Sequence, residues 1–171
     1  MSNPKHRIGA IDILGPLMEF KTEFLPDAGS YCLSTSIIPA GVAVPLHSHP
    51  SRETFYITSG ILEVFDGNEW QALGAGEVFD VMPDVRHALR NTSAHQVSTV
   101  HVTTMALASF YSSVGRSLPA GPPQPQDLEA FGAAAAEHGV WLGSAQDNAA
   151  IGISMFTQMA PRMKRPANMT H

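Results

Sequence analysis

The segment from Gly41 to Gly60, GVAVPLHSHPSRETFYITSG, decides the fold and the site. It holds two histidines separated by one residue, His47 and His49, and a carboxylate, Glu53, four residues further on. On an extended strand, side chains two residues apart point to the same face, about 6 to 7 Å from each other. Both imidazoles can therefore reach one metal ion. Glu53 joins them if the alternation continues after the turn at residues 50–52.

A second segment, GEVFDVMPDVRHALRN from Gly76 to Asn91, supplies His87. A closed β-barrel brings this strand opposite the first one. Three imidazoles and one carboxylate suit a divalent transition metal, namely Fe, Mn, Ni, Cu or Zn. Four protein ligands leave two positions of an octahedron open, which is typical of catalytic rather than closed structural metal sites.

The chain from Ile8 to about Tyr111 consists of short runs rich in Val, Ile, Thr, Phe and Tyr, separated by turn residues. This pattern predicts an all-β fold, with a last strand from Gln96 to Met105. The clearest hairpin signal is the turn at Asp66-Gly67-Asn68. Many short antiparallel strands with close turns favour a jelly roll or barrel, because closure removes exposed sheet edges.

The composition changes after the strands. Ser117 to Gln126, SLPAGPPQPQ, contains four prolines and predicts an extended strap, since proline interrupts both helix and sheet. Asp127 is the expected N-cap of a helix from Leu128 to His138, which Gly139 ends. For 147–163, helix and irregular structure remain equally open. We expect a barrel over 1–112, a strap over 113–126, and a helix and tail over 127–171.

Composition and charge narrow the class of protein. The 171 residues carry a formal charge of -5, which would repel a nucleic acid backbone, so we expect no nucleic acid partner. The chain holds no run of 18 apolar residues, and its N-terminus lacks the apolar stretch of a secretory signal. The single Cys32 cannot form an internal disulfide. We therefore expect a cytoplasmic protein without a membrane anchor, whose partner is a small-molecule substrate.

Both histidine segments resemble the two conserved motifs of the cupin superfamily, over about 41–91. The first motif agrees with the family pattern at every defining position, with intervals of five, one, three and six residues between Gly41, His47, His49, Glu53 and Gly60. Five such positions are a specific signal.

The second motif keeps Gly76, His87 and Asn91 at the family spacing. Its proline, Pro83, lies one place later than usual, and Asp84 or Val85 stands where a turn glycine is expected. The departure concerns the loop before His87 more than His87 itself.

The cupin resemblance implies an all-β, double-stranded β-helix (jelly-roll barrel) with a C-terminal helical extension. It also implies that a metal is held at the positions matched by His47, His49, Glu53 and His87. The strap and the helix that follow the barrel resemble single-domain cupins similar to quercetin 2,3-dioxygenase. That subgroup implies a dioxygenase acting on a small aromatic or enolic, flavonol-like substrate, with Glu53 also as a catalytic proton relay. Cupin chains commonly form dimers, so the resemblance also implies a homodimer.

Two other classes stay open, because fold and metal do not decide the reaction. One is a cupin that binds a metal or small ligand without turnover, as a sensor or structural module. The other is a metal-dependent isomerase.

Several further residues have a structural and a functional interpretation. Three histidines are expected to be strand or surface residues rather than ligands: His95, His101 and His138. Cys32 is expected to be a buried, inert thiol. Arg86 is expected to be solvated, to pair with Asp80 or Asp84, or to meet an acidic substrate. By strand alternation, three apolar residues share the face of the ligands and form either a pocket wall or barrel core: Phe55, Ile57 and Leu89.

Overall fold

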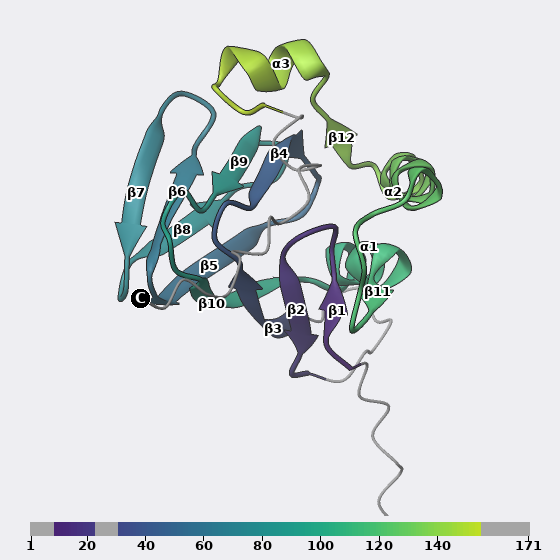
Figure 1. Ribbon diagram of the computed structural model, residues 1–171, viewed down its shortest axis with the longest axis horizontal. Coiled ribbons are helices and arrows are strands. Elements are labelled where there is room, and N and C mark those ends of the chain that lie inside the picture. Colours follow the sequence, from purple (N-terminus) through teal and green to yellow (C-terminus); the bar gives the residue numbers. More distant parts are fainter. Residues whose placement is uncertain (1–8, 23–30, 155–171) are drawn as a thin grey trace, which may run out of the picture.

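The computed structural model describes residues 9–22 and 31–154, which form two antiparallel β-sheets joined into a jelly-roll barrel (Figure 1). In strand order, the larger sheet contains β11 (Arg116–Ser117), β1 (Ile11–Asp12), β2 (Leu17–Phe20), β3 (Tyr31–Ile38), β10 (Val97–Thr104), β5 (Glu53–Ser59) and β8 (Val78–Val81). The smaller sheet contains β12 (Trp141–Leu142), β4 (Ala43–Ser48), β9 (His87–Arg90), β6 (Ile61–Phe65) and β7 (Trp70–Gly74). The predicted all-β barrel is confirmed.

The inner faces of the two sheets form the main core. Residues alternate between buried and partly exposed along β3 and β10, as expected for strands that cover a core on one side. Phe55 and Ile57 of β5 and Leu89 of β9 belong to this cluster, together with Leu62 and Val64 of β6. Of the two interpretations of Phe55, Ile57 and Leu89, the structure therefore supports barrel core.

The predicted hairpin at Asp66-Gly67-Asn68 connects β6 to β7. One carboxylate oxygen of Asp66 accepts hydrogen bonds from the backbone N–H groups of Asn68 and Glu69, at 2.9 and 3.0 Å. Gly67 has a φ of 101°, a conformation that side chains other than glycine rarely adopt. Local turn chemistry thus determines the position of this hairpin.

Helix α1 (Met105–Val114) corrects the prediction that the β pattern extends to about Tyr111. The strand ends at Thr104, whose hydroxyl accepts a hydrogen bond from the backbone N–H of Leu107 and caps the helix. Met105 and Ala108 then pack into a second apolar cluster beside β1, β2 and β3. The apolar run after Thr104 looks like a strand in sequence because α1 is apolar on two sides: Met105 and Ala108 pack in one cluster, and Leu107 and Phe110 pack in another.

Helix α2 (Pro125–Glu137) begins earlier than predicted, and its N-cap is Gln124 rather than Asp127. Asp127 lies at the third helical position, where its carboxylate accepts a hydrogen bond from the backbone N–H of Gln124. Helices α1 and α2 lie side by side next to the barrel (Figure 1) and share an apolar cluster. The division into barrel, strap and helical tail stays a prediction.

The C-terminal extension continues with β12, which pairs with β4, and with α3 (Ala145–Ala150). Ser144 caps α3 with Asp147 in a reciprocal capping box. Within the open range 147–163, residues 147–150 form the end of α3, and 151–154 form a turn followed by irregular structure. The rest of that range lies outside the described residues.

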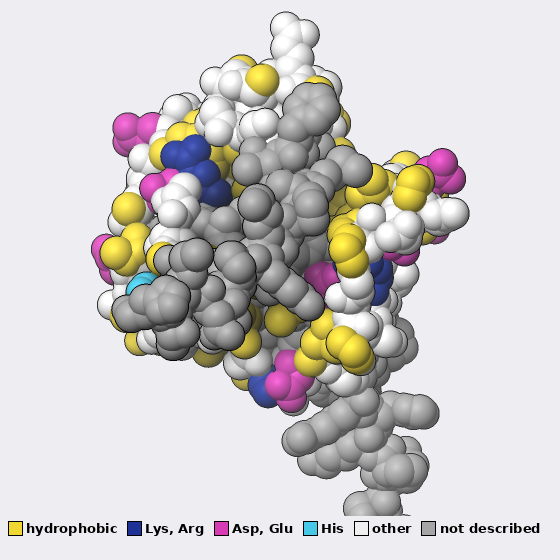
Figure 2. All heavy atoms as spheres, viewed as in Figure 1, with side chains coloured by type: hydrophobic (Ala, Val, Ile, Leu, Met, Phe, Trp, Pro, Cys, Tyr) yellow, Lys and Arg dark blue, Asp and Glu magenta, His cyan; other side chains and the backbone are white. Residues whose placement is uncertain are grey.

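None of the helices in the described ranges is long and apolar enough to cross a membrane. On the face drawn in Figure 2, the described Lys and Arg side chains lie at separate places among apolar and acidic ones. The part of this face that the structure describes therefore presents no continuous basic patch.

Candidate metal centre

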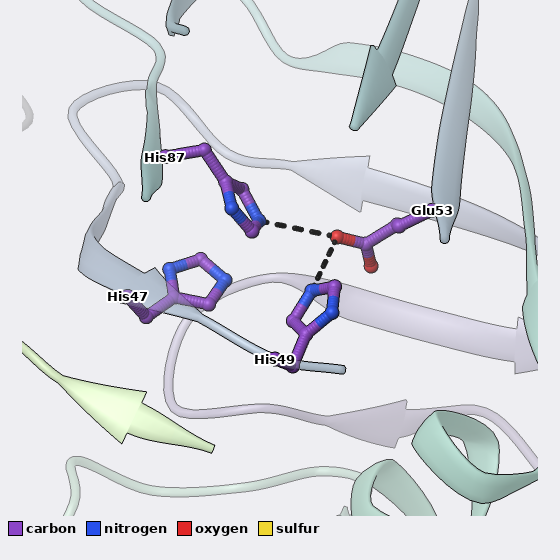
Figure 3. Close-up of side chains that lie close together, drawn as sticks. All are labelled: His47, His49, Glu53 and His87. Carbon is purple, nitrogen blue, oxygen red and sulfur yellow. Dashed lines mark hydrogen bonds and ion pairs between the residues drawn. The ribbon is translucent and has the colours of Figure 1, made fainter. Parts of the chain in front are cut away.

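The four residues predicted as ligands lie close together, where β4 ends and β5 and β9 begin (Figure 3). His47 lies in β4, His49 directly follows that strand, Glu53 begins β5 and His87 begins β9. One potential ligand atom from each of the four residues lies within 4.8 Å of all the others. Because β4 and β9 belong to one sheet and β5 to the other, the barrel itself brings the ligand set together.

Each of the three histidines is held by its Nδ1 atom. The partners are backbone carbonyl oxygens two residues away: Pro45 for His47 at 2.7 Å, Ser51 for His49 at 2.9 Å, and Val85 for His87 at 2.9 Å. A carbonyl oxygen only accepts hydrogen bonds, so each Nδ1 carries the proton and donates. In the neutral rings the lone pair then lies on Nε2, the tautomer that ligates a metal through Nε2.

The Nε2 atom of His87 is buried and makes no hydrogen bond. Oε2 of Glu53 lies 3.3 Å away, but the two atoms are not aligned for a hydrogen bond. A buried polar atom without a partner is unfavourable, and in native proteins it commonly marks a missing ion or water. Here the atom lies close to three other groups that could ligate a metal. The residues present therefore fit a divalent metal ion.

The carboxylate of Glu53 uses its two oxygens differently. Oε2 faces the histidines, 3.2 Å from Nε2 of His49 and 3.3 Å from Nε2 of His87. Oε1 points away and accepts hydrogen bonds from Nε2–H of His101 at 2.7 Å and from the hydroxyl of Tyr111 at 2.5 Å. Glu53 is only 1% exposed, so these contacts replace water around the charge.

Without an ion, the electrostatics of the site favour the metal-binding forms of His47 and Glu53 and the protonated form of His49. Burial, assisted by the neighbouring His87, lowers the pKa of His47 to about 3, so this ring is a neutral imidazole. Burial opposes ionisation of Glu53, but the charge and hydrogen bond of His101 and the contacts of His49 and His87 outweigh it and hold the pKa of Glu53 well below its usual range. Burial also acts to lower the pKa of His49, yet the hydrogen bond with Glu53 raises it overall.

The loop before His87 reaches its position without the turn glycine of the family pattern. Asp84 takes that place with a φ of 64°, in the left-handed region that Asp and Asn tolerate better than most residues. Its backbone N–H donates to the carbonyl oxygen of His49 at 2.8 Å and so ties the two ligand-bearing segments together. The absence of the turn glycine therefore does not remove His87 from the group of predicted ligands.

The remaining candidates fall outside the ligand cluster. His95 is exposed, and His138 packs near Phe110 with ring centroids 5.7 Å apart. Arg86 lies over the ring of Trp141, 4.2 Å from its centroid. The pairing of Arg86 with Asp80 is wrong, because Asp80 accepts hydrogen bonds from Arg52 across the neighbouring strand.

Sequence reasoning missed the contribution of His101 and Tyr111. His101 is a strand histidine outside the ligand cluster, as expected, but it is fully buried and bonded to Glu53. The available signal was its inward strand alternation between the buried Thr99 and Thr103. No sequence signal pointed to Tyr111, because the helix that carries it was not predicted.

Comparison with known proteins agrees with this geometry. Residues 34–103 match the Cupin domain family. No curated protein matches the chain. Among solved structures, the polyketide cyclase RemF from Streptomyces resistomycificus is 15% identical with a TM-score of 0.50, and the match covers 60% of this chain and 79% of that one. An RmlC-like cupin from Shewanella frigidimarina is 18% identical with a TM-score of 0.50, covering 64% and 94%.

At these identities the structural matches show the fold alone. The chain contains a cupin domain with the cupin double-stranded β-helix fold, followed by a short helical region. The predicted likeness to quercetin 2,3-dioxygenase stays a prediction.

Proposed function

We propose that this protein is a metal-dependent cupin enzyme whose ion is held by Nε2 of the three histidines and Oε2 of Glu53. The observation that carries the proposal is the convergence of these four atoms, together with the buried Nε2 of His87 that has no other hydrogen-bond partner. The donor set fits Fe, Mn, Ni, Cu or Zn.

The reaction we propose is a dioxygenation of a small aromatic or enolic substrate. When bound, the ion would act as a Lewis acid toward the substrate oxygen, beside a second open position. Glu53 is held as a carboxylate. Its Oε2, the oxygen that His101 and Tyr111 do not hold, would leave the ion and accept the proton of an enol or phenol as the substrate binds. His47 is the least buried of the four proposed ligands and lies on β4, the strand that pairs with β12.

Metal content and oxygen uptake test the proposal together. Protein loaded separately with iron, manganese and nickel is incubated with flavonols and related enols, with and without oxygen. We expect about one ion per chain and oxygen uptake with at least one metal, and His47→Ala should lose both. His95→Ala, which changes an exposed histidine, is the matched control.

The outcomes separate the remaining classes. Metal binding without oxygen uptake in any combination would overturn the dioxygenase and favour a sensor, while turnover without oxygen would indicate an isomerase. A protein that binds no metal would overturn the site itself. The small-molecule substrate as partner, the homodimer and the cytoplasmic location stay predictions.

A further inference from the structure

The Oε1 atom of Glu53 is held by two residues that come from separate elements. His101 lies in the middle of β10, and Tyr111 lies in α1, beyond the residues that match the cupin family. Both donate hydrogen bonds to the same carboxylate oxygen, at 2.7 and 2.5 Å. This arrangement places two donors behind the carboxylate, on the side away from the three ligand histidines (Figure 3 shows the ligand side).

His101 is fixed in this orientation. Its Nδ1 lies 3.0 Å from the hydroxyl oxygen of Ser34 on β3, and its ring stacks on Phe55 with centroids 4.7 Å apart and planes 21° apart. The side chain is fully buried, so it has no solvent-facing alternative. The N–H of its Nε2 is therefore a rigid donor toward Glu53.

Tyr111 is fixed by the packing of α1. The ring lies against the apolar cluster that contains Met105 and Ala108, and its centroid is 5.8 Å from that of His101. Burial, together with the charge of Glu53, raises the pKa of Tyr111 well above its usual value of about 10. The hydroxyl consequently keeps its proton and acts as a donor.

A carboxylate that binds a metal through both oxygens must free both of them. To present both oxygens to an ion, the carboxylate of Glu53 would have to rotate and break the hydrogen bonds of Oε1. Two short hydrogen bonds on Oε1, one from His101 and one from Tyr111, oppose this rotation and leave Oε2 facing Nε2 of His49 and His87. Hydrogen bonds of this kind orient metal ligands, and their removal typically changes metal affinity by about 10- to 100-fold.

We infer that His101 and Tyr111 are positioning residues of the metal centre, which hold Oε1 of Glu53 and restrict this carboxylate to binding a divalent metal ion through Oε2 alone. The inference rests on the proposed metal site. One of the two hydrogen bonds comes from α1, because Tyr111 lies outside the residues that match the cupin family.

Cobalt(II) alone is the probe, because its visible absorption reports coordination number and geometry without any turnover. The full-length protein, Tyr111→Phe and the control Tyr56→Phe, which changes an exposed tyrosine of β5, are titrated with cobalt in competition with a chelator. For Tyr111→Phe we expect about a tenfold weaker affinity, because Glu53 loses a hydrogen bond that orients it. We also expect a less intense, shifted spectrum, because the second oxygen of Glu53 can then reach the ion. Tyr56→Phe should match the wild type.

Two further comparisons separate positioning from a general structural role. In a Glu53→Gln background, Tyr111→Phe should no longer change affinity or spectrum, because the effect acts through the carboxylate. His101→Gln keeps an N–H donor and should stay closer to the wild-type spectrum than His101→Leu. These histidine variants also serve if Tyr111→Phe does not fold.

Wild-type affinity and spectrum in both Tyr111→Phe and His101→Leu would overturn the inference while leaving the metal site intact. An effect of Tyr111→Phe that persists unchanged with Glu53→Gln would also overturn it. If the wild type binds no cobalt, the proposed function fails, and this inference fails with it.

Discussion

His47 of β4 and His87 of β9 are direct partners in the strand register, and their ring centroids lie 4.1 Å apart. The two residues belong to different sequence motifs, and antiparallel pairing of β4 with β9 places both rings at the same end of the barrel. Because each Nδ1 is bonded to a backbone carbonyl, both Nε2 atoms remain for a shared ion. Strand pairing and backbone anchoring together therefore prepare the site before any ion binds.

Metal should stabilise the fold, because the ligand atoms converge only in the folded chain. At a free metal concentration 100 times the dissociation constant, we expect the free energy of unfolding to rise by about 2.7 kcal/mol. Urea unfolding with and without metal measures the change. His47→Ala should lose the increase and His95→Ala should keep it; an equal increase in both variants would place the ion elsewhere.

The backbone conformation of Asp84 makes a specific prediction for the loop before His87. Its φ of 64° disfavours branched side chains, so Asp84→Val should lower the free energy of unfolding by about 1 to 2 kcal/mol. Asp84→Asn, which tolerates the left-handed region, should stay close to the wild type. Thermal or urea unfolding distinguishes the two, and equal stability of both variants would contradict this role of the backbone.

Arg116 should be a structural residue of the strap. Its guanidinium pairs with Asp12 of β1 and Asp127 of α2, and the side chains of Arg116 and Asp12 are only 18% and 8% exposed. Arg116→Met leaves the Asp12 charge without its ion-pair partner and should lower the free energy of unfolding by about 3 kcal/mol. The matched change Arg52→Met breaks an exposed pair with Asp80 and should have little effect. Comparable losses from both changes would refute the difference in burial as the cause.

The thiol of Cys32 should be unreactive in the folded protein. Burial raises its pKa, with a weaker opposing hydrogen bond involving Thr22, so the thiolate is rarer than in a free cysteine at every pH below that raised value. A chromogenic disulfide reagent at pH 8 should modify native protein far more slowly than urea-unfolded protein. Equal rates in the two states would show that the thiol is accessible.

The sequence by itself was sufficient to predict the barrel and the set of candidate metal ligands. Both follow from local rules: strand alternation predicts that His47 and His49 share a face, and a turn residue such as Gly67 sets where two strands reverse. The spacing of the second motif was sufficient to predict His87 as a metal ligand, although the loop before it lacks the turn glycine of the family pattern.

Only the tertiary structure decided what surrounds those side chains. The partners of Oε1 of Glu53 lie 48 and 58 residues further along the chain, one on a strand and one on a helix that starts at a capped strand end. No local pattern encodes a contact at that separation, because it depends on which strands pair and on how α1 packs against the barrel. The sequence therefore determined which residues can bind a metal, and long-range packing decided which oxygen of Glu53 is left to do so.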